Sequence, residues 1–219
     1  IAQSLNRRFG TRYRAGNIIM TVGAASGLNI ILKTLLNPGD EVVAIAPFFV
    51  EYGNYVRSYD GELVVVPPTT DDFQPGAAEV AKYITAKTRA VILNTPNNPT
   101  GVIYTADTLK KLAVMLEDKQ REYGTSIYII SDEPYRELAY DGADVPWIPG
   151  IYRNTIVGYS WSKSLSLPGE RIGYVVIPSE IDDGQLIFDA ACIANRVNGS
   201  VNAPSLFQRV VMRCVDVPT

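Results

Sequence analysis

Short apolar runs alternate with amphipathic segments along the chain, and this alternation restricts the folds that the chain can adopt. The strand-like runs fall at 18–21, 41–46, 62–66, 90–93, 127–130, 155–158 and 172–177. Segments with helical spacing of apolar residues fall at 1–9, 28–35, 49–59, 77–84, 105–123, 184–196 and 203–215. Several runs are apolar throughout, which is typical of strands covered on both faces of a parallel sheet. The sequence therefore predicts an α/β fold with three α/β/α layers around a mostly parallel, mixed central sheet.

The bulk composition is that of an ordinary globular chain. Of its 219 residues, 47% are hydrophobic and 20% are charged, and the formal net charge is −3. Because no basic excess marks a nucleic-acid surface, we expect no nucleic-acid partner. No apolar run approaches the roughly 18 residues that a membrane helix needs, and the start does not resemble a signal peptide. We therefore expect no membrane association and a cytoplasmic location.

Histidine is absent from the sequence, and this absence narrows the available chemistry. It excludes Ser-His-Asp and Cys-His catalysis and the commonest zinc sites, which leaves lysine, tyrosine, aspartate and glutamate as acid–base groups. Cys192 and Cys214 lie in apolar helical segments without a CxxC pattern. We therefore expect structural thiols and no metal site.

A small-residue segment, Gly23-Ala24-Ala25-Ser26-Gly27, follows the first strand-like run and opens a helical segment. Small residues let backbone N–H groups approach an anion, and the N-terminus of a helix favours negative charge. An ordinary strand-to-helix turn has the same composition, so both interpretations stay open. A Walker A loop is excluded because no Gly-Lys-Ser/Thr follows.

Two more polar segments follow strand-like runs. Asn94 to Gly101 contains two prolines that fix the backbone, so the Asn98 amide can bind a ligand oxygen at a small entropy cost. Ser131 to Tyr135 places Asp132 at a strand end, where a buried carboxylate needs a cationic partner such as a protonated ring nitrogen. A helix N-cap explains Asp132 equally well.

Lys163 is the candidate for the chemistry. It follows the strand-like run at 155–158, and open α/β sheets bind ligands at the carboxyl ends of their strands. Ser160 and Ser162 precede it, and Arg171 follows. A neutral lysine amine is a nucleophile, and desolvation or a neighbouring cation such as Arg171 favours that form. A lysine taken alone is more often a solvated surface charge.

These four segments, in this order, resemble the fold type I pyridoxal-phosphate enzymes, and specifically the class I/II aminotransferases of the aspartate aminotransferase superfamily. The motifs that carry the resemblance are Asn98-Pro99-Thr100-Gly101, Asp132-Glu133-Pro134-Tyr135, Ser160-Trp161-Ser162-Lys163 with Gly169 and Arg171, and Leu36-Asn37-Pro38-Gly39-Asp40-Glu41-Val42. The resemblance covers nearly the whole chain. It implies that residues 1–219 form the large, cofactor-binding domain of such an enzyme.

The resemblance also implies roles for individual residues toward pyridoxal 5′-phosphate. Lys163 is the catalytic residue, which forms a Schiff base with the cofactor and moves a proton between the substrate Cα and the cofactor. Asp132 pairs with the pyridinium nitrogen, and Asn98 and Tyr135 donate hydrogen bonds to the phenolic oxygen.

Six more positions follow from the same resemblance. Phe49 stacks on the cofactor ring, with a core aromatic as the alternative interpretation. The residues that hold the phosphate are Ala24, Ala25, Ser160, Ser162 and Arg171.

The function implied is transfer of an amino group between an L-amino acid and a 2-oxo acid, in a full-length protein that forms a homodimer. Two family elements are missing from the chain, the N-terminal arm and the C-terminal small domain that binds the substrate carboxylate. We therefore expect these 219 residues to capture cofactor with weak or no turnover.

Other functions compete with transamination. The same cofactor residues serve C–S lyases, related eliminating enzymes and regulator domains that bind the cofactor without turnover. Ser160 to Lys163 also matches the Ser-x-x-Lys of penicillin-binding serine acyltransferases, but no Lys-Thr-Gly or Ser-Asp-Asn-like segment occurs. A plain nucleotide-binding module is disfavoured because no G-x-G-x-x-G follows a strand-like run.

Overall fold

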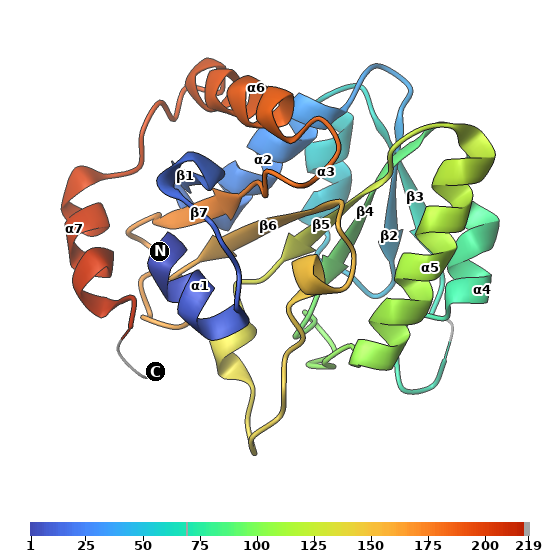
Figure 1. The fold of residues 1–219 in the computed structure, drawn as a ribbon, viewed down its shortest axis with the longest axis horizontal. Coiled ribbons are helices and arrows are strands. Elements are labelled where there is room, and N and C mark those ends of the chain that lie inside the picture. Colours follow the sequence, from blue (N-terminus) through green and yellow to red (C-terminus); the bar gives the residue numbers. More distant parts are fainter. Residues whose placement is uncertain (69, 217–219) are drawn as a thin grey trace.

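A computed structural model describes residues 1–68 and 70–216 and contains a seven-stranded mixed sheet (Figure 1). The strands are β1 (Ile18–Thr21), β2 (Glu41–Ile45), β3 (Glu62–Val66), β4 (Thr88–Asn94), β5 (Tyr128–Asp132), β6 (Thr155–Ser160) and β7 (Gly173–Val176). Their order in the sheet is β1-β7-β6-β5-β4-β2-β3. Strands β2 to β6 pair in parallel, while β7 is antiparallel to both β6 and β1. The predicted mixed, mostly parallel sheet is confirmed.

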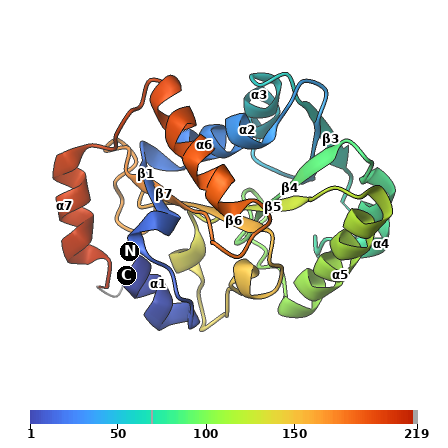
Figure 2. The same cartoon turned by 45° about the horizontal axis from the view of Figure 1, so that its top comes forward.

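Helices cover both faces of this sheet. They are α1 (Ala2–Phe9), α2 (Gly23–Leu35), α3 (Glu51–Arg57), α4 (Ala77–Val80), α5 (Ala106–Tyr123), α6 (Gly184–Val197) and α7 (Ser205–Cys214). Side chains of α2, α3 and α6 share one buried cluster with the sheet, and side chains of α4 and α5 share another with its opposite face. Figure 2 shows these two layers, with α1 and α7 at the β1 end of the sheet. The three-layer α/β/α prediction is confirmed.

Strand β2 shows why its sequence is apolar throughout. Val42 and Ala44 pack in the cluster with α2 and α3, whereas Val43 and Ile45 pack in the cluster with α5. Successive side chains of a strand point to opposite faces, and both faces of this sheet are covered. An unbroken apolar run therefore supplies apolar side chains to the buried clusters on both faces of the sheet.

Two helix ends are capped by residues of the types that commonly cap helices. Gly10 ends α1 in the left-handed conformation, with φ of 67°, and its N–H donates to the Asn6 carbonyl. The Thr105 hydroxyl caps α5 by accepting a hydrogen bond from the Thr108 N–H. These caps occupy backbone groups that a helix end leaves unpaired.

Some predicted boundaries are wrong, by five residues at the start of α2, by four at the end of α4 and by one or two elsewhere. Gly23 to Gly27 forms the first turns of α2 and not a separate turn. Strands β4, β5 and β6 run on to Asn94, Asp132 and Ser160, which the sequence placed in loops. The reason is pairing, because Asn94 lies opposite Asp132 in the ladder that joins β4 to β5. The polar residues are therefore held in the sheet itself.

Two further expectations concern the cysteines and the membrane. Cys192 and Cys214 are both free thiols of intermediate exposure. In the stretch from residue 1 to 216, leaving out residue 69, none of the helices combines the length and the apolar character needed to cross a membrane.

Candidate functional site

The sheet brings the ends of distant segments to one edge. Asp132 pairs with Asn94 on one side and with Gly158 on the other. Further along the same edge, Gly173 lies opposite both Ser160 and Thr21. The carboxyl ends of β4, β5, β6 and β1 thus meet, as expected for a ligand site in an open α/β sheet.

A cavity of about 220 Å³ opens at this edge. Every predicted site residue lines it: Ala24, Ala25, Phe49, Asn98, Asp132, Tyr135, Ser160, Ser162, Lys163 and Arg171. Its remaining lining residues are Leu28, Tyr55, Asn94, Pro134 and Pro168. Residues more than 140 positions apart in the sequence therefore face one space.

Asp132 lies at the floor of the cavity and is 5% exposed. The Tyr52 hydroxyl donates a 2.6 Å hydrogen bond to its Oδ2. Its Oδ1 is buried and has no hydrogen-bond partner among the described residues. Burial raises the pKa of Asp132 to about 6, with the Tyr52 hydrogen bond lowering it and the Glu133 charge raising it. A buried acceptor without a donor is costly, so Oδ1 is suited to a ligand that donates.

Asn94 supports both Asp132 and Asn98. Its Nδ2 donates to the Asp132 backbone carbonyl at 2.8 Å, and its Oδ1 accepts from the Asn98 N–H at 2.7 Å. Burial raises the pKa of Tyr135, as does the Asp132 charge, while a hydrogen bond with Asn98 opposes the shift. Asn98 and Tyr135 thus lie together on one wall of the cavity.

Lys163 is exposed and projects from the loop that follows β6. Its Nζ lies 5.6 Å from the centroid of the Tyr135 ring. This is within the range of a cation–π contact. The amine therefore lies beside Tyr135, in the cavity that Asp132 also lines.

The N-terminus of α2 and Arg171 form a positive corner of the cavity. No described side chain caps the first N–H groups of α2. The Arg171 guanidinium lies against Gly23, where an added Cβ would come within 2.5 Å of its Nη2. Its Nη1 donates to the Pro168 carbonyl at 2.7 Å, and the Ser160 hydroxyl donates to that of Ser162 at 3.1 Å. The corner suits an anion.

Two alternative interpretations from the sequence fail. Phe49 is 36% exposed, so it is not a core aromatic; its ring meets Tyr52 edge-on at 5.7 Å. Asp132 caps no helix, because it ends β5 and the short helix that follows begins after Tyr135.

Tyr52, which donates a hydrogen bond to Asp132, is a contact of the site that was not predicted from the sequence. It lies in the first turn of α3, three positions after Phe49, which precedes that helix, and the two rings are in contact. A tyrosine at this spacing was the available signal. Asn94 was predicted only as the first residue of a proline-containing segment. Its hydrogen bond with the Asn98 N–H was not predicted.

Comparison with known proteins identifies relatives over almost all of the chain. A family model for aminotransferase class I and II matches residues 1–218. An aspartate aminotransferase from Bacillus sp. is 36% identical over 83% of this chain and 46% of its own length. An arginine–pyruvate transaminase from Pseudomonas aeruginosa is 34% identical over 89% of this chain and 52% of its own length.

Solved structures agree with the sequence relatives. The crystal structure of an amino transferase from Eubacterium rectale has a TM-score of 0.97 and 47% identity, covering 99% of this chain and 55% of that one. This chain thus spans about half the length of the relatives it matches. By its sequence and by its fold, the chain belongs to the class I and II aminotransferase family, whose members use pyridoxal phosphate.

Proposed function

We propose that the protein transfers an amino group between an L-amino acid and a 2-oxo acid with pyridoxal 5′-phosphate, and that residues 1–219 form its cofactor-binding domain. The observation that carries the proposal is a single cavity lined by Lys163, by Arg171 and by Asp132, whose Oδ1 has no hydrogen-bond partner among the described residues. Because relatives named as aminotransferases are about twice as long, the proposed activity is that of the whole protein. An N-terminal arm and a small domain would supply its substrate-binding groups.

Asp132 fits a protonated ring nitrogen. Its Oδ2 is occupied by Tyr52, and its Oδ1 lacks a donor among the described residues. A pyridinium N–H would supply both the missing hydrogen bond and a compensating charge, which is what a buried carboxylate requires. Asn98 and Tyr135, on the adjoining wall, would donate to the phenolic oxygen of the same ring.

The positive corner fits a phosphate. In our proposal the Ala24 and Ala25 N–H groups and Arg171 bind the phosphate oxygens, with Ser160 and Ser162 as hydroxyl donors. A helix N-terminus and an arginine stabilise the same charge, and charge-assisted hydrogen bonds are the stronger class. Phe49, which is partly exposed at the cavity, would stack on the ring.

Lys163 has two roles in this proposal. Its Nζ would hold the cofactor by condensing with the aldehyde as a Schiff base, with loss of water, and once displaced by the substrate amine it would carry a proton to and from the substrate Cα. When bound, the cofactor supplies an aldehyde carbon that exchanges amines and a ring that withdraws electrons from the bond being broken. Asp132 would keep the ring nitrogen protonated, which favours that withdrawal.

A cofactor titration tests the assignment. Pyridoxal 5′-phosphate is added to the wild type and to Lys163→Ala, followed by visible absorbance, borohydride reduction and peptide mapping. We expect reduced cofactor on the peptide that contains residue 163 in the wild type and none there in the variant. Lys82→Ala, which alters an exposed lysine paired with Glu79, is the matched control and should trap like the wild type. Equal trapping by Lys163→Ala would overturn the assignment.

A product assay on the full-length protein tests the reaction itself. Formation of glutamate from 2-oxoglutarate and an amino donor supports transamination. Pyruvate and ammonia from a cysteine conjugate would instead indicate a C–S lyase, and cofactor binding without either product would indicate a regulator domain. The isolated 219-residue chain should bind cofactor with weak or no turnover, and efficient transamination by it would contradict that part of the proposal.

We also propose that the full-length protein is a homodimer. Helix α6 supports this, because its apolar Leu186, Ile193 and Val197 are 68%, 63% and 65% exposed. Their spacing of seven and four residues places them along one helix face, and an exposed apolar stripe is typical of an interface. Sedimentation of the full-length protein checks this, and a monomer at micromolar concentration would contradict it.

A further inference from the structure

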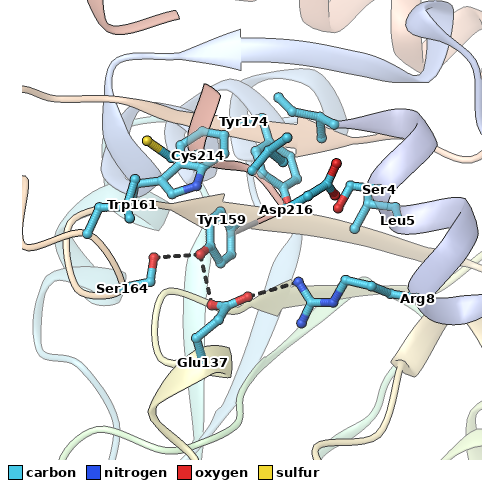
Figure 3. A pocket seen from close by; sticks show the side chains of 13 residues that line it. Ser4, Leu5, Arg8, Glu137, Tyr159, Trp161, Ser164, Tyr174, Cys214 and Asp216 are labelled. Atoms are coloured by element: carbon cyan, nitrogen blue, oxygen red, sulfur yellow. Dashed lines mark hydrogen bonds and ion pairs between the residues drawn. The ribbon is translucent and has the colours of Figure 1, made fainter. Parts of the chain in front are cut away.

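The segment from Tyr159 to Leu165 separates two cavities. Its residues that line the cofactor cavity are Ser160, Ser162 and Lys163. Its residues that line a second cavity, of about 300 Å³, are Tyr159, Trp161, Ser164 and Leu165. Figure 3 shows this second cavity from close by. The side of this segment that faces away from the cofactor cavity, here called its back side, therefore makes contacts of its own.

Three side chains on that back side are linked by hydrogen bonds. The Tyr159 hydroxyl lies 2.8 Å from Oε2 of Glu137 and 2.8 Å from Oγ of Ser164. On the far side, Arg8 Nη1 donates to Oε1 of Glu137 at 3.1 Å (Figure 3). Ser164 follows Lys163 in the chain, so a hydrogen bond to the Ser164 side chain restrains the loop one residue from the lysine.

The protons that these groups carry decide which group donates and which accepts in each hydrogen bond. An ionised carboxylate only accepts, and a tyrosine hydroxyl has one proton. Tyr159 therefore donates to Glu137, and its lone pair accepts the proton of Ser164. Burial raises the pKa of Tyr159 and the Glu137 charge raises it further. The Tyr159 hydroxyl thus stays protonated and can donate to Glu137.

Tyr159 is a rigid anchor for the loop. It belongs to β6 and is 5% exposed. Its ring meets Trp161 edge-on, with centroids 5.3 Å apart, and lies 5.0 Å from the Tyr174 ring. A hydrogen bond to a side chain held in this way positions its partner at little extra entropy cost.

The loop after β6 needs such an anchor. The turn bonds Leu165 N–H to Trp161 O and Ser166 N–H to Lys163 O are 3.3 and 3.2 Å long. Ser166 has φ of 53°, in the left-handed region that non-glycine residues rarely adopt. In contrast to these long bonds and this unfavourable backbone, the residue next to the lysine, Ser164, makes a shorter hydrogen bond of 2.8 Å with Tyr159.

We propose that Glu137, Tyr159 and Ser164, here termed the brace, are positioning residues that hold the loop so that the Lys163 amine projects into the cofactor cavity. The inference rests on the proposed function, because it assigns the brace to the covalent step at Lys163. Arg8 holds the Glu137 carboxylate from the side opposite to Tyr159. None of the three brace residues lines the cofactor cavity, so their effect passes through the position of Lys163.

The test separates covalent attachment from simple occupancy of the cavity. In the full-length protein, the rate of pyridoxal 5′-phosphate attachment to Lys163 is measured by absorbance with borohydride trapping. Affinity is measured with pyridoxine 5′-phosphate, which has the same ring and phosphate but no aldehyde. We expect Tyr159→Phe and Ser164→Ala to slow attachment by about three- to tenfold, the range for loss of the one hydrogen bond that joins these two side chains. Affinity for pyridoxine 5′-phosphate should stay within about twofold of wild type.

Two controls identify the hydrogen bond as the cause. Ser164→Thr keeps the hydroxyl and should retain the wild-type attachment rate. Tyr174→Phe removes a hydroxyl from the same aromatic cluster, and no bond from that hydroxyl to the lysine loop occurs within residues 1–68 and 70–216. Its rate should therefore stay within about twofold of wild type. The double variant Tyr159→Phe/Ser164→Ala should be no slower than the slower single variant, because both remove one shared contact.

The outcomes distinguish the two proposals. If the wild type attaches no cofactor at Lys163, the proposed function fails. If the wild type attaches cofactor and both single variants do so at its rate, the brace proposal alone is overturned. A parallel loss of pyridoxine 5′-phosphate affinity, or an equal effect of Tyr174→Phe, would also overturn it, because the role would then be general packing.

Discussion

The Tyr52 hydroxyl donates a 2.6 Å hydrogen bond to Oδ2 of Asp132, across 80 positions of sequence. This bond occupies Oδ2, while Oδ1 is buried without a hydrogen-bond partner among the described residues. It also lowers the pKa of Asp132 against the effect of burial, which raises that pKa to about 6. Tyr52 thus governs both the orientation and the charge of the acid in the site.

Tyr52→Phe should raise the pKa of Asp132 above about 6, because it removes the interaction that lowers it. Cofactor affinity should fall by about three- to tenfold at pH 7, since one hydrogen bond that orients the carboxylate is lost. Carbon NMR of the Asp132 carboxyl and a cofactor titration measure the two effects. Tyr55→Phe is the control, because Tyr55 lines the same cavity but does not contact Asp132 through a hydrogen bond among the described residues. An unchanged Asp132 pKa in Tyr52→Phe would contradict the assignment.

Asp132→Asn should flatten the pH dependence of stability in the cofactor-free protein. The folded-state pKa of Asp132 is about 6 against an ordinary 3.8, so between these values the folded state binds the proton and the unfolded state does not. Wild-type stability therefore falls as pH rises from about 4 to 6, by up to about 3 kcal/mol from this residue. The asparagine variant lacks that decrease.

Urea unfolding at pH 4.5 and pH 7.5 measures this difference. Asp107→Asn is a suitable control, since Asp107 is 74% exposed and lies on the outer surface of α5. It should keep the wild-type pH dependence. The interpretation of Asp132 as a costly buried charge is wrong if Asp132→Asn retains the full decrease between the two pH values.

Gly23→Ala should weaken cofactor binding by more than about tenfold, because the new methyl group would displace the Arg171 guanidinium from the positive corner. Gly23 has φ of 77°, so backbone strain adds a cost to folding. Gly124→Ala provides the same backbone strain at φ of 66° with no heavy atom within 4 Å of the added Cβ. It should lower stability without changing cofactor affinity. Equal affinity losses in both variants would indicate strain and not the displaced arginine.

Arg136→Ala should lower the free energy of unfolding by about 3 to 5 kcal/mol, because it leaves a buried carboxylate unpaired. Arg136 Nε lies 2.5 Å from Oε2 of Glu133, and the two side chains are 5% and 1% exposed. The guanidinium also donates to the carbonyls of Val145 and Pro146. Urea denaturation measures the loss.

An exposed ion pair serves as the matched control for Arg136→Ala. Lys111 lies 2.7 Å from Asp107 on α5, and the two side chains are 69% and 74% exposed. Because exposed pairs contribute little, Lys111→Ala should change the free energy of unfolding by less than about 0.5 kcal/mol. A loss in Arg136→Ala as small as this would show that the buried pair is not structural.

The sequence predicted the layers and the cavity lining because both depend on local patterns. An unbroken apolar run such as that of β2 indicates a strand covered on both faces, and short motifs fix the residues around Asn98, Asp132 and Lys163. Tyr52 and the brace could not be found in this way. Their contacts join residues 80, 22 and 129 positions apart, from Tyr52 to Asp132, Tyr159 to Glu137 and Arg8 to Glu137. Strand ends were misplaced for a related reason, because pairing with neighbouring strands decides where they stop.

The antiparallel direction of β7 has a consequence for how the site could be rebuilt. Strands β6 and β7 are neighbours joined at the cavity edge, so Lys163 and Arg171 lie on one connection between Ser160 and Gly173. In the proposed function, the lysine that would hold the cofactor covalently and the arginine that would hold its phosphate therefore lie on a single connection. Exchanging the connection between Ser160 and Gly173 among relatives would transfer Lys163 and Arg171 together. Asp132, on β5, would remain that of the recipient protein.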